Sequence, residues 1–344
     1  MKDANVLKDF ALDADGLSVL ASLQLGLLEE DISNTKSSAW FSDNTVELQK
    51  LKMSWRLRWR GMVQRGFDEL QTKPTPALLE PGDQNLESQL NKLRRSSDRA
   101  PAGLILVEMV SWDAYWPFEK DQKDFKDLKI DPDLRKKYLE RAATRLGFEG
   151  KRAGELRDAI ESAHKGLTGY WWKLALGVAA GLGLGALTLG IAAPFIGGAI
   201  GAAMGLTGAA ATSAGLAALG GGAVAVGGLG MAGGTAVVVG GGAVLGMGAG
   251  GAIGRIATAM SAEAVLLSSA KLEVVLKEFI LQGQHDTAKV QEILFAQRKS
   301  IHALEEELDR VRMGGNKSDE RIEQLENAID VMRKALKRNQ ELAA

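Results

Sequence analysis

LALGVAAGLGLGALTLGIAA (Leu174–Ala193) opens the stretch that decides the fold, an uncharged segment that continues to Gly254. Residues 174–254 contain no Asp, Glu, Lys or Arg, although the 344-residue chain has 42 basic and 43 acidic residues. The same 81 residues hold 27 of the 41 glycines. Because about 20 apolar residues in a helix cross a hydrocarbon core of about 30 Å, the segment predicts four membrane crossings, or two that form one hairpin.

Both ends of this segment carry residues typical of a membrane interface. Aromatic residues and a lysine precede it, and an arginine follows it: Tyr170, Trp171, Trp172, Lys173 and Arg255. Such side chains anchor helix ends at the level of the lipid headgroups. In the alternative interpretation the aromatics cap a helix in the core of a soluble domain, but core helices are usually far shorter than this segment.

Glycines four residues apart form three ladders within the segment. This spacing lets helix backbones approach closely, in one chain or between chains, while adding little apolar area. The sequence therefore predicts helix packing inside the membrane at Gly177, Gly181, Gly185, Gly197, Gly201, Gly205, Gly242, Gly246, Gly250 and Gly254.

The region before the segment has the periodicity of helices. Apolar residues recur at steps of three and four up to about residue 71, and the prolines and polar residues that follow predict a linker at about 72–101. The run Gly103–Trp112 fits a short strand or a buried helix, and we expect the helix. Residues 131–162 predict two helices, starting at Asp131-Pro132 and broken at Gly147–Gly150.

The region after the segment carries two runs with heptad spacing, separated by Gly314-Gly315-Asn316. Two helices folded back on each other would give this pattern, as would one long helix with a hinge, and we expect the hairpin. The predicted seam consists of Ile301, Leu304, Leu308, Val311, Ile322, Leu325, Ile329, Met332 and Leu336.

A basic helix with two tryptophans is predicted between residues 50 and 65. It contains Trp55 and Trp59 and no acid, and its basic residues are Lys50, Lys52, Arg56, Arg58, Arg60 and Arg65. Such a helix suits an anionic lipid surface. The alternative, which we slightly favour, is a solvated helix whose acidic partners lie on other elements, and nothing else in the chain favours nucleic acid.

These patterns together predict an all-α fold in three parts. They are a helical N-terminal domain (1–169), a Gly/Ala-rich membrane-inserting helical segment (170–255) and a C-terminal coiled-coil hairpin (256–344). The whole layout, including the stretch IAAPFIGGAIGAAMG (Ile191–Gly205), resembles α-helical pore-forming proteins. It is similar in plan to the cytolysin A and haemolysin BL type toxins, to the colicin hydrophobic hairpin and to apolipoprotein L. The resemblance implies a chain that folds in water, then exposes its apolar segment, inserts and oligomerises.

The sequence offers no pattern for catalysis, metal or cofactor binding. It has no cysteine, and His164, His285 and His302 lack the spacing of metal ligands. The glycines near Gly181 have no preceding strand and no acidic residue that could bind a ribose, so they do not predict a dinucleotide site. We therefore expect no enzyme, no cofactor and no nucleic-acid partner.

The expected function follows from the apolar segment. We expect a membrane-inserting homo-oligomer that forms a pore, as an effector or toxin does, with the lipid bilayer as its partner. The alternative is a permanent membrane-anchored scaffold that uses its coiled coil to bind proteins. The N-terminus does not have the pattern of a signal peptide. We therefore expect a membrane-associated protein that has a soluble cytoplasmic precursor.

Overall fold

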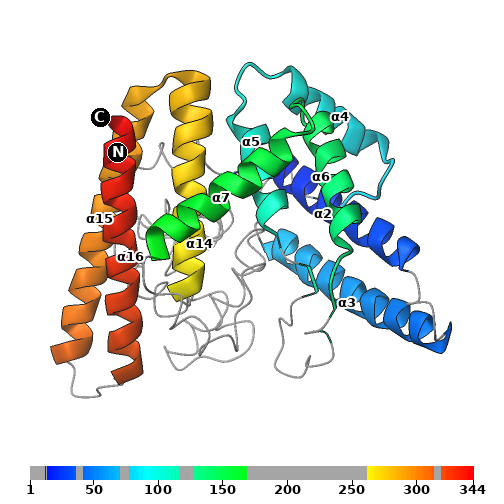
Figure 1. Ribbon diagram of the computed structural model, residues 1–344, viewed down its shortest axis with the longest axis horizontal. Helices are drawn as coiled ribbons and strands as arrows, with labels where there is room; N and C mark the ends of the chain where they lie inside the picture. Colours follow the sequence, from blue (N-terminus) through cyan, green and yellow to red (C-terminus); the bar gives the residue numbers. More distant parts are fainter. Residues whose placement is uncertain are drawn as a thin grey trace. The chain divides into compact units, whose positions relative to one another are not determined.

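The computed structural model describes residues 12, 14–35, 42–69, 77–112, 114–115, 125, 128–168, 262–313 and 319–344. These residues are mostly helical and include no strand, which confirms the all-α class (Figure 1). The chain divides into two compact units. One comprises Leu12–Asp68 with Thr72–Arg157, and the other contains Asp158–Ala344.

Helix α2 (Ala14–Asn34) is the central helix of the first unit. Its leucine-rich sequence favours a helix, and its residues from Leu17 to Leu28 are almost entirely buried. It packs against α4 (Gln84–Arg95), α5 (Ala100–Ser111) and α6 (Pro132–Arg145). The hydroxyl groups of Ser33 and Thr35 and the amide of Asn34 each donate to a carbonyl four residues earlier, which closes the helix.

Helix α5 is buried along almost its whole length, which explains why its apolar run shows no one-sided pattern. Pro101 lies in its first turn, where a missing N–H is tolerated. At its other end, Arg135 Nη2 donates to the carbonyls of Val110 and Trp112 at 3.2 and 2.7 Å. The helix expected within Gly103–Trp112 is therefore confirmed.

The predicted helical pair over residues 131–162 is also confirmed. Helix α6 starts at Pro132, and the Asp131 side chain accepts a hydrogen bond from the N–H of Leu134 at 2.8 Å, as an N-cap should. The chain then turns through Gly147, which has a φ of 85° that favours glycine, before α7 (Arg152–Thr168) begins.

The tract 72–101 contains a helix where the sequence analysis expected a linker. Helix α4 spans Gln84–Arg95, and Asp83 caps it by accepting from the N–H of Asn85 at 2.8 Å. Only Leu86 and Leu90 of this helix are buried. Two leucines four residues apart provide a sufficient apolar face to hold it on the unit, although its other residues are mostly polar.

The second unit contains helices that run side by side (Figure 1). Helix α14 (Ala262–Val275) continues as a π-helix, η5 (Leu276–Gln284), and the chain turns at His285 into α15 (Thr287–Met313). Helix α16 (Asp319–Ala343) packs against both α14 and α15. The two heptad runs are thus two helices, on either side of the glycine pair.

Candidate interaction surfaces

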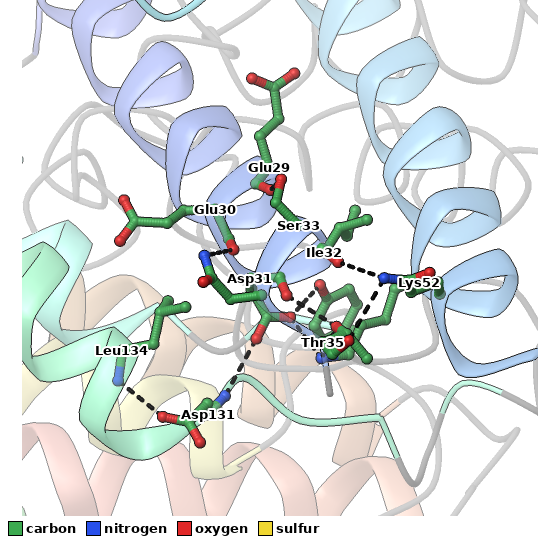
Figure 2. A network of polar contacts seen from close by, with 12 residues as sticks. Glu29, Glu30, Asp31, Ile32, Ser33, Thr35, Lys52, Asp131 and Leu134 are labelled. Atoms are coloured by element: carbon green, nitrogen blue, oxygen red, sulfur yellow. Dashed lines mark hydrogen bonds and ion pairs between the residues drawn. The ribbon is translucent and has the colours of Figure 1, made fainter. Parts of the chain in front are cut away.

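A buried carboxylate, Asp31, joins four parts of the first unit (Figure 2). Its Oδ2 accepts from Lys52 Nζ at 2.7 Å and from the Tyr115 hydroxyl at 2.6 Å. Its Oδ1 accepts from the backbone N–H of Asp131 at 3.2 Å. We call these groups the Asp31 network. It connects α2 to α3 (Ser42–Glu69), to the turn that follows α5 and to the start of α6.

The Asp31 network is closed to solvent. Asp31, Lys52 and Tyr115 are 2%, 4% and 1% exposed. Burial raises the pKa of Tyr115, and the charge and hydrogen bond of Asp31 raise it further, so the hydroxyl keeps its proton and remains a donor. Tyr115 also has a φ of 66°, a left-handed backbone that costs a non-glycine residue energy. The network stabilises the packing of these helices. Its side chains are buried and are not accessible to a substrate.

Four aromatic rings hold the inner face of α3 beside this network. Trp55 stacks on Trp59 with ring centres 6.2 Å apart and meets the edge of Tyr115 at 5.2 Å. Trp112 lies 5.7 Å from Trp59. All four side chains are at most 1% exposed. The tryptophans of the predicted basic helix are therefore core residues, and they fix α3 by one face.

The opposite face of α3 is exposed. Val46, Met53 and Leu57 are 53%, 37% and 59% exposed, and Lys50 lies between them. The steps of four, three and four residues place all of these side chains on one stripe of the helix. We call Val46, Lys50, Met53 and Leu57 the α3 outer stripe.

Some basic residues of α3 form ion pairs with acids on other elements, and others are exposed to solvent. Lys52 pairs with Asp31, Arg56 pairs with Glu29 at 3.1 Å, and Arg60 pairs with Glu80. The Arg58 guanidinium lies over the Phe125 ring at 5.9 Å, and Lys50 is exposed. The side chain of Arg65 lies outside the described residues. The ion pairs agree with the interpretation in which acidic partners lie on other elements.

The second unit carries a groove between α15 and α16. Its volume is about 450 Å³, and we call it the hairpin groove. The floor contains Leu308 and Ile329, which are 8% and 4% exposed. Its walls are charged and consist of Glu305, Asp309, Arg312, Glu326, Asp330 and Arg333.

Ion pairs connect the two helices across the groove, and the helices are antiparallel. Arg312 donates to Glu326 and Arg333 donates to Glu305, both at 2.5 Å. Further along, the Asn339 amide donates to the Gln297 side chain at 3.1 Å, and both residues are fully buried. Gln297 Nε2 and Asn339 Oδ1 are buried without a hydrogen-bond partner, so this pair contributes to the register through its one hydrogen bond.

Most of the predicted seam residues are buried in the second unit. Six are buried: Ile301, Leu304, Leu308, Leu325, Ile329 and Met332. Val311, Ile322 and Leu336 are half-buried. The sequence analysis missed the polar members of the interface, Gln297 and Asn339, because it searched the heptad runs for apolar residues only.

The predicted membrane residues lie outside the described part of the chain. This applies to the interface residues Tyr170, Trp171, Trp172, Lys173 and Arg255 and to all three glycine ladders, which span 177–185, 197–205 and 242–254. Within the described ranges, no group of three or more His, Asp or Glu side chains is arranged to hold a metal ion. His285 and His302 are exposed, and His164 is half-buried.

No protein family model, curated protein or solved structure matches this chain, so no relative bears on the resemblance to pore-forming proteins. The expected membrane-inserting, pore-forming function is contradicted, and so is the alternative of a membrane-anchored scaffold. In the part of the chain that the structure describes, no helix is long and apolar enough to cross a membrane. Helix α2 includes Asp15, Glu29, Glu30 and Asp31, and α5 has only 12 residues. Their apolar residues are buried in the first unit.

Proposed function

We propose that this chain is a helical interaction protein whose hairpin groove binds a basic amphipathic helix. The observation that carries the proposal is the pairing of an apolar floor, Leu308 and Ile329, with walls that hold four carboxylates and two guanidinium groups. An amphipathic helix binds such a groove through apolar residues three and four positions apart. Asp309, an exposed carboxylate on the α15 wall, favours basic side chains beside that apolar stripe.

The charges on the walls indicate which groups attract the incoming helix. Arg312 and Arg333 each bind a glutamate across the groove, and Lys334 binds Asp330 at 2.8 Å. Asp309 is exposed on the α15 wall. Exposed charges contribute little to affinity at physiological salt, but they select the sign of the partner and speed association.

Helix α16, which forms one wall of the groove, is held by α14, so the groove needs little rearrangement to bind a helix. Arg338 on α16 forms a two-pronged ion pair with Glu273 on α14, with both N–O distances at 2.6 Å. Glu273 is buried, and its bond to Arg338 raises the pKa of the guanidinium. A platform that is rigid before binding loses less entropy when its partner docks.

The test uses the full chain and two synthetic helices of equal length. One carries leucines at heptad spacing with lysines elsewhere, and the other replaces each lysine with glutamate. We expect fluorescence anisotropy to detect binding of the basic helix, which weakens as salt is added because the charges are screened. The acidic helix should bind much more weakly. Equal binding of both helices would contradict the proposal.

Charge reversal in the groove gives the matched comparison. Asp309→Lys should weaken binding of the basic helix several-fold. Glu306→Lys is the control, because Glu306 lies on the same helix, is exposed and does not line the groove. If both variants lose the same affinity, the attraction comes from overall charge and the groove is not the site.

A further inference from the structure

We infer that the helix that occupies the hairpin groove is α3 of a second copy of this chain, so that the protein assembles head to tail. The inference rests on the proposed function, since it names the partner of the same groove. It depends on three features of α3: its exposed aliphatic stripe, the sign of its charge and the way its inner face is anchored.

The first feature is the α3 outer stripe. Five large hydrophobic side chains are exposed in the described part of the chain, and three of them, Val46, Met53 and Leu57, belong to this stripe. Exposed apolar residues scattered singly are normal, but three on one helix face mark an interaction surface. Their spacing is the one by which an amphipathic helix enters a groove.

The second feature is charge complementarity. Between residues 48 and 67 the sequence has six basic residues and no acid. Arg56 and Arg60 are neutralised by Glu29 and Glu80, and the Arg58 guanidinium lies over the Phe125 ring. Lys50 is exposed in the stripe itself. The ammonium group of Lys50 suits the groove wall, where Asp309 presents an exposed carboxylate.

The third feature is that α3 is already a rigid helix. The Asp31 network and the rings of Trp55, Trp59 and Trp112 hold its inner face. Its outer face is thus presented without any need for folding on binding, which would reduce affinity.

The chemistry of the stripe favours a protein partner. Val46, Met53 and Leu57 are aliphatic, whereas surfaces that bind single-stranded nucleic acid use exposed aromatic rings. The tryptophans of α3 are buried and cannot stack on bases.

The two surfaces differ, so the contact between copies is heterologous. Each copy has one α3 outer stripe and one hairpin groove, and each pairing leaves one free surface at either end. Such contacts continue into an open filament or close into a ring.

The experiment exploits the absence of cysteine from the chain. Leu57→Cys and Asp309→Cys variants are purified separately, mixed and oxidised. A disulfide forms only where the two Cα atoms come within about 7 Å, so the cross-link reports a specific contact. We expect a product that joins one chain of each variant. Glu306→Cys, outside the groove, is mixed with Leu57→Cys as the control and should give several times less product.

The other outcomes overturn the inference in distinct ways. Cross-linking of Leu57→Cys with itself would mean that two α3 helices pair. A cross-link that forms only when both substitutions are on one chain would mean that the groove holds the chain's own α3. If no cross-link forms while the synthetic basic helix still binds, the second copy is not the partner but the proposed function stands. If that helix also fails to bind, the proposed function fails as well.

A second variant measures assembly without cysteine. Leu57→Asp changes an exposed side chain, so circular dichroism should show unchanged helicity. Light scattering should show a lower average mass than for the unsubstituted chain, which should itself fall as salt is added. An unchanged mass for Leu57→Asp would overturn the inference.

Discussion

The hydroxyl of Tyr115 donates a 2.6 Å hydrogen bond to Asp31, a residue 84 positions earlier in the chain. The same carboxylate oxygen accepts from Lys52. One oxygen thus joins α2 both to α3 and to the turn after α5, and its loss should affect the whole first unit.

We expect Tyr115→Phe to destabilise the first unit by about 1.5–3 kcal/mol, the usual contribution of a hydrogen bond to a charged group. Urea unfolding followed by circular dichroism measures the change. Because the pKa of Tyr115 is raised above its ordinary value of 10.0, the unfolded chain loses the phenolic proton first. The stabilisation by this bond is therefore complete below about pH 10 and decreases above it. The variant should lack this part of the alkaline decrease, and an identical alkaline decrease in both proteins would contradict the assignment.

Lys52→Met should have a larger effect, because it leaves the buried Asp31 carboxylate without its cationic partner. Breaking one side of a buried ion pair costs about 3–5 kcal/mol. Adding Asp31→Asn to Lys52→Met should recover part of the loss, since the amide removes the unpaired charge and keeps an oxygen that accepts from Tyr115. Urea unfolding of both variants tests this, with Lys50→Met as the control because Lys50 is exposed on the same helix. A double variant less stable than Lys52→Met would count against the ion-pair explanation.

The sequence predicted local features better than distant ones. Three predicted features depend on only a few neighbouring residues: the N-cap at Asp131, the helix in Gly103–Trp112 and the break after Met313. In the structure α6 begins directly after Asp131, α5 ends at Ser111 and α15 ends at Met313. Helix α4 was missed because its apolar face consists of two buried leucines, and the nearby prolines gave a stronger loop signal.

The Asp31 network was not predicted because spacing along the chain carries no information about it. Glu30 and Asp31 are neighbouring acids near the end of α2, yet Asp31 is buried and Glu30 forms an exposed ion pair with Arg141. Periodicity places Asp31 at the end of a helix but cannot identify Tyr115 as its partner. The strongest compositional signal comes from residues 174–254, which lie outside the described residues. The expected function was inferred from this segment, and the contacts within the two units give no information about it.

Glu29 provides a prediction about pH. Burial raises its pKa above the ordinary 4.5; Arg56 and Arg60 oppose this rise, while Glu80 adds to it. As pH rises past 4.5, the unfolded carboxyl loses its proton before the folded one does. The stability that this group contributes is therefore present at low pH and is lost as pH rises through the folded pKa.

Glu29→Gln should consequently be more stable than the unsubstituted chain at pH 7, by less than about 1 kcal/mol because the side chain is partly exposed. Urea unfolding at pH 4 and pH 7 would measure the difference between the proteins at each pH. Glu149→Gln serves as the control, since the Glu149 side chain is 76% exposed. If Glu29→Gln is less stable at pH 7, the ion pair with Arg56 outweighs burial.

The last prediction concerns Gly26, in the middle of the buried helix α2. A methyl group at this position would lie 2.4 Å from the Tyr138 hydroxyl, which donates to the Leu23 carbonyl at 2.7 Å. Gly26→Ala should therefore destabilise the first unit by about 1–3 kcal/mol, as overpacking of a core does. The nearest other atoms are Tyr138 Cζ at 3.4 Å and Pro81 Cγ at 3.6 Å, which are ordinary contacts.

Removing the hydroxyl should reverse the sign of this effect. In a Tyr138→Phe background the clash is gone, and alanine is preferred to glycine inside a helix by about 0.5–1 kcal/mol. Gly154→Ala in α7 measures this preference alone, because a methyl group there meets no atom within 4 Å. A double-mutant cycle by urea unfolding should give a coupling of about 1.5–4 kcal/mol between Gly26 and Tyr138, the difference between the two effects of Gly26→Ala. If Gly26→Ala costs the same with tyrosine and with phenylalanine at position 138, then the hydroxyl is not what requires glycine there.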